Sequence, residues 1–424
     1  MREGWGNPKL GIPRESLGQP PVKTVPRHPF FRFVIGMLVV LLSYTFAVGQ
    51  DTTGDFHFGA SGQTTVALTE QSVFEATING KGPFKLFFDT GANVNILNPE
   101  VIAQLGLTPA GDQADIHGMS GGKLEVKPYR ADEVRIGDLA ITGQIFFNVP
   151  MPLPEIVGAV GYELMSRLVI KSDNEHHQLT FYDPARFVYK GGGEKLELLP
   201  NTRGLIVHAR VGNAVGDFGL DTGAIGKIGI ALNYRFAQQN HLLRHSFLFK
   251  LFHSSYHDVF SGGADGAAPP ATLQRVQSVC LGTACVPHVV GEFSDGDTSQ
   301  YAGLIPNEML RRFTFTIDWQ HRAIYIEKTS HWNNTDVYNQ TGLELDPADN
   351  GTALVVTKVF SHSVASKAHI KVGDRIVLIN DRPPAPTWYS DDPAFLQRPG
   401  TVVTLSIQRD NATQRLRLKL KDVL

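Results

Sequence analysis

Residues 85–92 read KLFFDTGA, and residues 218–224 read FGLDTGA. Each stretch is a short apolar strand that runs into Asp-Thr-Gly, so each places a carboxylate, Asp89 or Asp221, where a buried strand ends. A carboxylate is costly to place there unless other groups stabilise it. One such tripeptide is within reach of chance in a chain of this length, whereas two in matching apolar surroundings indicate a functional pair.

These stretches resemble the hallmark of the pepsin and retropepsin class of aspartic proteases, a hydrophobic pair followed by Asp-Thr/Ser-Gly. Retropepsins supply one Asp from each of two identical subunits, and pepsin-like enzymes supply both from one duplicated chain. This chain carries two copies. The resemblance implies a mainly β, bilobal fold of acid-protease β-barrel lobes, with Asp89 and Asp221 as the catalytic residues and a protein or peptide as the substrate.

The expected chemistry gives each residue of the two motifs a role. Two carboxylates about 3 Å apart share one proton and titrate as a pair. The ionised carboxylate takes a proton from the attacking water, and the protonated one donates to the tetrahedral intermediate. Gly91 and Gly223 let the backbone pass close to the opposite carboxylate, and the resemblance implies that the hydroxyls of Thr90 and Thr222 bond across the lobe interface. The reaction requires neither a metal nor a cofactor.

An alanine follows each glycine, at Ala92 and Ala224, as in retropepsins. Pepsins usually place Ser or Thr there. A hydroxyl donor to each carboxylate is therefore missing, which removes one contribution that favours ionisation. We expect a pH optimum less acidic than that of gastric-type enzymes.

An internal repeat predicts two lobes. Residues 158–168 align without a gap with residues 303–313, and the same offset lays the segment 134–141 over 279–286. A repeat with a period above 100 residues indicates duplicated domains rather than a solenoid. The predicted domains are a signal peptide or N-terminal anchor (1–49), an N-terminal lobe (50–190), a C-terminal lobe (191–330), a polar linker (331–341) and a small C-terminal domain (342–424).

Two local features of the first lobe stand out. Residues 98–107 read NPEVIAQLGL and predict one short helix, with Asn98 as its cap and Gly106 as its stop. The Gly-rich tip at 118–122 lies where the family has its flap, the mobile hairpin that covers substrate. An ordinary hairpin loop explains the same glycines. The candidate flap and substrate residues are His117, Gly118, Gly121 and Gly122.

The chain has two cysteines, Cys280 and Cys285. If Gly282-Thr283 forms a two-residue turn, Cys280 faces Cys285 at a non-hydrogen-bonded pair, where the Cα separation suits a disulfide. Two buried thiols are the alternative.

The C-terminal residues 342–424 resemble a PDZ domain of the bacterial secreted-protease type, an α+β fold. The signature is a short helix followed by Gly-Asp-x-Ile/Val-x-x-Ile-Asn, which residues 373–380 match. His369 departs from the pattern, because the family usually has Gly there. PDZ domains bind an extended peptide as an added strand, so the resemblance implies a C-terminal peptide ligand. The expected receiving residues are Gly351, Thr352, Ala353, Leu354 and Val355. A structural domain with a degraded groove is the alternative.

Charge and the N-terminal sequence bear on partners and location. The 39 basic and 41 acidic residues nearly balance, so no overall field attracts nucleic acid. Basic residues precede the apolar run 33–48, which ends in small residues suited to signal-peptidase cleavage. We expect export to a periplasmic or extracellular location. The alternative is a retained segment 33–48 that anchors the chain in a membrane.

The sequence thus predicts an exported aspartic endopeptidase whose C-terminal domain recruits peptide or substrate. A non-catalytic peptide-binding protein that uses the same cleft and PDZ groove is the alternative. The presence of both carboxylates favours the enzyme.

Overall fold

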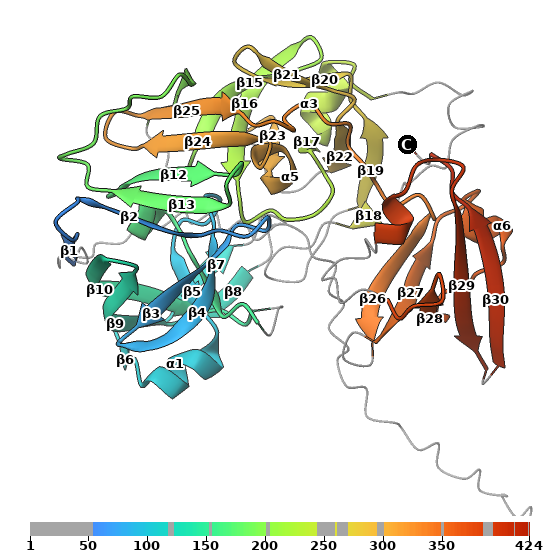
Figure 1. The fold of residues 1–424 in the computed structure, drawn as a ribbon, viewed down its shortest axis with the longest axis horizontal. Coiled ribbons are helices and arrows are strands. Elements are labelled where there is room, and N and C mark those ends of the chain that lie inside the picture. Colours follow the sequence, from blue (N-terminus) through green and yellow to red (C-terminus); the bar gives the residue numbers. More distant parts are fainter. Residues whose placement is uncertain are drawn as a thin grey trace, which may run out of the picture. The chain divides into compact units, whose positions relative to one another are not determined.

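The computed structural model describes residues 54–117, 123–151, 155–200, 204–243, 259–260, 270–294, 301–348, 352–384, 393–410, 412–422 and 424. Within these residues the protein is mainly β, as Figure 1 shows. The predicted fold, two β-rich lobes followed by a small C-terminal domain, is confirmed. The predicted signal or anchor segment lies outside the described residues, and no described helix is long and apolar enough to cross a membrane.

The first lobe is built on an eight-stranded sheet with the order β1-β10-β5-β11-β4-β3-β9-β6. Strands β10 and β9 also pair with each other, so the six strands from β10 to β9 close into a barrel. The elements of this lobe are β1 (Phe56–His57), β3 (Val73–Ile78), β4 (Lys81–Phe88), β5 (Asn95–Leu97), α1 (Pro99–Leu105), β6 (Thr108–Pro109), β9 (Pro128–Ile136), β10 (Leu139–Asn148), β11 (Gly158–Val160) and α2 (Tyr162–Met165). A separate hairpin joins β7 (Ala114–His117) to β8 (Lys123–Val126).

The second lobe repeats this plan in a nine-stranded sheet with the order β18-β19-β22-β17-β23-β16-β15-β20-β21. Its elements are β15 (Ile206–Val211), β16 (Ala214–Asp221), β17 (Ile230–Asn233), α3 (Tyr234–Gln239), β18 (Val259–Phe260), β19 (Pro270–Arg275), β20 (Ser278–Leu281), β21 (Ala284–Pro287), β22 (Val290–Ser294), β23 (Gly303–Pro306) and α5 (Asn307–Leu310). The strand that ends in each Asp-Thr-Gly pairs in parallel with the strand that opens the repeated segment, β4 with β11 and β16 with β23.

A six-stranded sheet joins the lobes. Its order is β14-β25-β24-β12-β13-β2, and β12 of the first lobe pairs with β24 of the second from Val169↔Asp318 to Ser172↔Phe315. The strands are β2 (Gln63–Ala67), β12 (Val169–Asp173), β13 (Gln178–Tyr182), β14 (Glu194–Glu197), β24 (Phe313–Asp318) and β25 (Ala323–Lys328). One apolar core runs through both lobes and contains the fully buried rings of Phe74, Phe218 and Phe313. The lobes therefore form one folding unit, because neither buries its core alone.

Two predicted local features are present as the sequence suggested. Helix α1 begins after Asn98, whose side-chain oxygen accepts the N–H of Glu100, and ends at Gly106 with φ +66°. In the second lobe, Leu281 pairs with Ala284 and Cys280 with Cys285 across a two-residue turn. Cys280 and Cys285 form a disulfide with a Cα separation of 4.0 Å.

The segment 331–341, predicted as a linker, packs into the fold. Asp336 is buried and pairs with the guanidinium of Arg312, and its Oδ2 accepts the N–H of Val290 at 2.7 Å. Asn333, Asn334 and Thr335 of the same segment are exposed, so the segment combines a solvent-facing stretch with a buried carboxylate that satisfies groups of the second lobe.

The C-terminal domain is a five-stranded antiparallel sheet with the order β26-β27-β28-β29-β30. Its elements are β26 (Leu343–Ala348), β27 (Ala353–Val359), α6 (Val364–Lys367), β28 (Arg375–Ile379), the 3-10 helix η2 (Pro393–Leu396), β29 (Val402–Arg409) and β30 (Ala412–Lys419). The sheet packs around its own apolar core, which includes Leu354, Phe395 and Ile407.

The predicted peptide-receiving edge is wrong. Ala353, Leu354 and Val355 lie in β27, which pairs with β26 along one side and with β28 along the other, so its backbone groups are already used. The edge had been placed there by resemblance alone, and the preceding residues 343–348 contain Asp346 and Pro347, which disfavour a strand. They nevertheless form β26, with a single neighbour among the described strands. Thr352 precedes β27, and Gly351 lies outside the described residues.

Candidate active site

Each Asp-Thr-Gly sits where a buried strand leaves its sheet. Phe88 and Leu220, the residues before the aspartates, are buried, and Asp89 donates its N–H to Val160 O at 3.1 Å. In the second lobe Asp221 pairs with Pro306 of β23. The neighbouring parallel strand therefore fixes the start of each loop, and the two loops have matching surroundings.

The carboxylates are held in the same way in both lobes. Asp89 Oδ1 accepts N–H bonds from Gly91 at 2.9 Å and from Ala92 at 3.0 Å. Asp221 Oδ1 accepts the equivalent bonds from Gly223 at 2.9 Å and Ala224 at 3.0 Å. Both aspartates are fully buried. Two amide donors per carboxylate offset part of the desolvation cost of this burial.

The two carboxyl groups face each other across the lobe boundary. A Cβ built on Gly91 would lie 2.4 Å from Asp221 Cγ, and one built on Gly223 would lie 2.3 Å from Asp89 Cγ. Each glycine thus passes against the carboxyl group of the other lobe, at a distance that only a hydrogen in place of Cβ allows. The structure brings Asp89, Asp221, Gly91 and Gly223 into one site.

Burial raises the pKa values of both carboxyls of this pair. Desolvation, followed by the negative charge of Asp221, raises the pKa of Asp89 well above its usual range. Desolvation also raises the pKa of Asp221, to about 7, against the opposing effect of the N–H bonds from Ala224 and Gly223. The pair therefore holds a proton at pH values where an exposed aspartate is ionised.

The outer oxygens lack the hydroxyl donors of pepsin-type sites. Within the described residues, Asp89 Oδ2 and Asp221 Oδ2 are buried without a hydrogen-bond partner. The residues placed to supply a hydroxyl are Ala92 and Ala224, and both are buried. Each carboxyl thus has one oxygen, Oδ1, that accepts two amide N–H groups and one, Oδ2, without a hydrogen-bond donor among the described residues.

The two threonines lock the loops together. Thr90 Oγ1 donates to Leu220 O at 2.8 Å and accepts the N–H of Thr222 at 3.0 Å. Thr222 Oγ1 reciprocates by donating to Phe88 O and accepting the N–H of Thr90 at 3.1 Å. All four bonds cross the lobe boundary and are buried.

Further contacts across the boundary were not foreseen from the sequence. Ser72 donates its hydroxyl to Asn307 Oδ1 at 2.9 Å, and Asn307 Nδ2 donates to Glu70 O at 2.7 Å. The backbone N–H of Asn307 also donates to Ala224 O at 2.9 Å. Asn307 therefore ties the loop of Asp221 to the first lobe. Within the repeat it stands where the first lobe has Tyr162, a mismatch that could have drawn attention to it.

The hairpin β7–β8 packs over both active-site loops. Ile116 and Val126 on this hairpin share an apolar cluster with Val94 and Ile225, which follow the first and second motifs. The assignment of this hairpin as a flap stays a prediction. His117 ends β7 opposite Lys123. The predicted tip residues Gly118, Gly121 and Gly122 lie outside the described residues.

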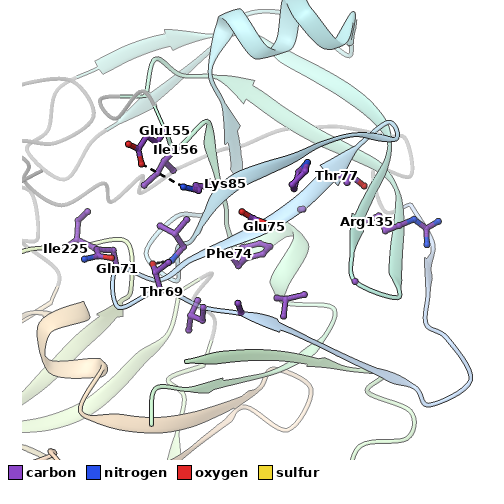
Figure 2. Close-up of a pocket in the computed structure, with 17 residues that line it drawn as sticks. Thr69, Gln71, Phe74, Glu75, Thr77, Lys85, Arg135, Glu155, Ile156 and Ile225 are labelled. Carbon is purple, nitrogen blue, oxygen red and sulfur yellow. Dashed lines mark hydrogen bonds and ion pairs between the residues drawn. The ribbon is translucent and has the colours of Figure 1, made fainter. Parts of the chain in front are cut away.

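A groove of about 630 Å³ is lined by residues of β2 and β3 and by Ile225, which follows the second motif. Neither Asp89 nor Asp221 lines it. Figure 2 shows Ile225 at one end and Arg135 at the other, with Glu75 and Thr77 of β3 between them. Lys85 and Glu155 form an ion pair of 3.9 Å on its rim. The groove has mostly apolar walls and a charged rim. Within the described ranges, no cluster of three or more His, Cys, Asp or Glu side chains is arranged to hold a metal ion.

A duplicated β fold with two facing Asp-Thr-Gly loops is the arrangement of an aspartic protease. Residues 74–164 match the family model described as aspartyl protease, and residues 338–420 match that of the PDZ domain. The protein therefore contains an aspartyl protease domain followed by a C-terminal PDZ domain, as the sequence resemblance implied. The first match contains Asp89 and ends before the second lobe. No curated protein matches the chain.

The close approach of each glycine to the opposite carboxyl predicts the effect of adding one methyl group. Gly91→Ala or Gly223→Ala must push the carboxyls apart, so we expect kcat/KM to fall at least about 100-fold, with a stability loss of about 1–3 kcal/mol. Gly192→Ala is the matched control, because its added Cβ would meet no atom within 4 Å. Peptidase kinetics and urea unfolding measure both effects. Full activity in Gly91→Ala would contradict the facing geometry.

The raised pKa values predict how stability depends on pH. A carboxyl whose folded pKa lies above its unfolded value of 3.8 stabilises the fold at low pH, and that contribution is lost as pH rises through the folded value, about 7 for Asp221. Asp221→Asn replaces the titrating carboxyl with an amide, so the variant does not lose this stability as the pH rises. The free energy of unfolding of the variant relative to the parent should therefore rise between pH 4 and pH 8, by up to about 4 kcal/mol. Urea unfolding at several pH values measures it, and a constant difference would refute the raised pKa.

Proposed function

We propose that this protein is an exported aspartic endopeptidase that hydrolyses peptide bonds with a water molecule activated between Asp89 and Asp221. The observation that carries the proposal is the pair of buried carboxyls, each held by two backbone N–H groups and facing the other across the lobe boundary. Two such groups have little structural use, because burying them costs stability.

The roles of the two carboxyls follow from their shared proton. The ionised carboxylate accepts a proton from the water as the water oxygen attacks the carbonyl carbon, and the protonated carboxyl donates to the carbonyl oxygen. Collapse of the tetrahedral intermediate moves a proton to the leaving nitrogen and breaks the C–N bond. The threonine bonds across the boundary keep the two groups in register during these transfers. Fixed amides around the inner oxygens avoid reorganisation during the reaction.

Cleavage within a chain is inferred from the resemblance of the two Asp-Thr-Gly loops to those of pepsin-like enzymes. The groove that runs from Ile225 along β3 to Arg135 is a candidate surface for an extended substrate. Export is inferred from the basic and apolar N-terminal sequence, and the PDZ domain supplies a second surface for peptides.

Replacement of either aspartate tests the activity directly. We expect the full chain to cut an unfolded protein at internal bonds, and Asp89→Asn or Asp221→Asn to lower the rate at least about 100-fold, because each variant lacks one partner in proton transfer. Asp138→Asn, an exposed change in the first lobe, is the control. Mass spectrometry of the fragments measures the cleavage, and a pepstatin-like inhibitor should block it. Cleavage that survives either aspartate substitution would remove the proposed mechanism, and a peptide-binding role would then account for the cleft.

The missing hydroxyl donors predict the pH profile. Burial without those donors raises the pKa values of the dyad, so the pH–rate profile should peak above pH 3. Ala224→Ser supplies a hydroxyl that favours the ionised carboxylate, and both limbs of the profile should move to lower pH, by roughly half a unit or more. A parent profile that peaks near pH 2 to 3, or a serine variant that shifts the profile upward, would contradict this account.

A further inference from the structure

The C-terminal sheet has two edge strands, β26 and β30, and β26 lies at one margin of the sheet (Figure 1). Val356 donates its N–H to Asp374 O and accepts the N–H of Gly373, both at 2.8 Å, so its backbone groups point toward β28. Val356 pairs with Leu345 of β26. Leu345 and Val356 therefore form a non-hydrogen-bonded antiparallel pair, in which both residues direct their backbone N–H and C=O groups away from each other. The N–H and C=O of Leu345 therefore point to the outer edge, and by alternation those of Leu343 and Pro347 do so as well.

Part of this outer edge is already occupied by the chain itself. The N–H of Leu343 donates to Thr341 Oγ1 at 3.2 Å, and Leu343 O accepts the side-chain amide of Asn339 at 3.3 Å. At the other end of β26, Pro347 has no N–H to offer. Among the described residues, Leu345 is therefore the outward residue of β26 for which neither the N–H nor the C=O has a partner and both can bond to an added strand.

The turn at residues 339–342 places a side-chain oxygen among backbone amides. Asn339 Oδ1 accepts the N–H of Thr341 at 2.9 Å and its hydroxyl at 2.6 Å. Successive amides at the head of an edge strand form the type of concave site that captures a terminal carboxylate. Here the carboxamide of Asn339 and the hydroxyl of Thr341 take two of these N–H groups. Both side chains are buried, at 3% and 0% exposure.

Backbone bonds fasten the same turn to its surroundings. Gln340 donates its N–H to Phe395 O at 3.1 Å, which ties the turn to η2, and Thr341 O accepts the N–H of Ala365 in α6 at 3.1 Å. Gly342 O accepts the N–H of Phe360 at 2.9 Å. Backbone hydrogen bonds therefore connect the turn to both η2 and α6, and the turn lies at the N-terminal end of β26.

We propose that the turn at residues 339–342 is an intramolecular competitor for the carboxylate end of a PDZ ligand. The proposal rests on the peptide-binding role suggested for this domain. A free C-terminus must displace the carboxamide of Asn339 and the hydroxyl of Thr341 before it reaches the amides of Thr341 and Leu343. The apparent association constant is then the intrinsic one multiplied by the fraction of molecules in which the turn is open. A peptide therefore gains little affinity from a free terminal carboxylate.

Peptide binding to variants of the full chain tests the competitor. All proteins carry Asp89→Asn to prevent cleavage, and the probes are fluorescein-labelled decapeptides with apolar C-terminal residues, each prepared as free acid and as amide. We expect the parent to distinguish acid from amide less than about threefold. Asn339→Ala with Thr341→Val should raise the affinity for the free acid at least about tenfold and leave that for the amide unchanged.

Two matched variants separate the turn from the rest of the edge. Asn380→Ala removes a carboxamide that accepts the N–H of Thr404 at 2.9 Å in another turn of the same domain, and should change neither affinity. Pro347→Val restores an outward N–H and should strengthen acid and amide binding equally.

Several outcomes would overturn the proposal. These are a parent that prefers the free acid tenfold, a folded double variant that binds the acid no better than the parent, or the failure of every variant to bind either peptide. Circular dichroism and thermal unfolding establish that the double variant is folded. Proteolysis by the chain with Asp89 intact is measured separately, so loss of the competitor and loss of the protease activity give different results.

Discussion

Two buried carboxyl groups that face each other impose the conditions that the rest of the protease fold meets. Bringing two acidic groups out of water into contact is unfavourable unless they share a proton and receive donors. The four amide bonds to the inner oxygens supply the donors, and they require the chain to bend sharply after each aspartate. Gly91 and Gly223 permit that bend and the close approach of the opposite carboxyl. The strands β11 and β23 pair in parallel with the strands that lead into the two loops and so fix where each loop begins. This requirement accounts for the same order of elements in both lobes of this chain.

The two lobes are alike at the dyad and different at their boundary. The threonine bonds are reciprocal, as expected for duplicated loops. At the next matched position, Tyr162 packs edge-on against Trp319 with ring centroids 5.0 Å apart, whereas Asn307 bonds to Ser72 and to Glu70 O. A single chain can specialise each side of its interface in this way. An assembly of two identical subunits uses the same residue on both sides.

Much of the site could be predicted because its signal is local. The apolar strand followed by Asp-Thr-Gly specifies the dyad within eight residues, and the cap and stop of α1 and the turn between Cys280 and Cys285 are equally short patterns. The contact between Ser72 and Asn307 joins residues 235 positions apart, and no local sequence pattern around either residue predicts it. The peptide-receiving edge was misplaced because it was set by resemblance alone, and the ladder with β27 makes residues 343–348 the edge strand. In β26, long-range pairing overrode the local preference of Asp346 and Pro347 against a strand.

The turn at 339–342 and Pro347 limit the backbone groups of β26 that can bond to a peptide, and they also limit its pairing with other chains. An exposed strand edge is a template for pairing with other chains, and a proline or a covering segment reduces that hazard. The turn at 339–342 cannot move freely, because Asp336 lies three residues before Asn339 and is fixed by Arg312 and by the N–H of Val290. Three residues span at most about 11 Å. A turn that opens must stay within that reach or break the bonds of Asp336, so its displacement and the packing of segment 331–341 on the second lobe are energetically linked.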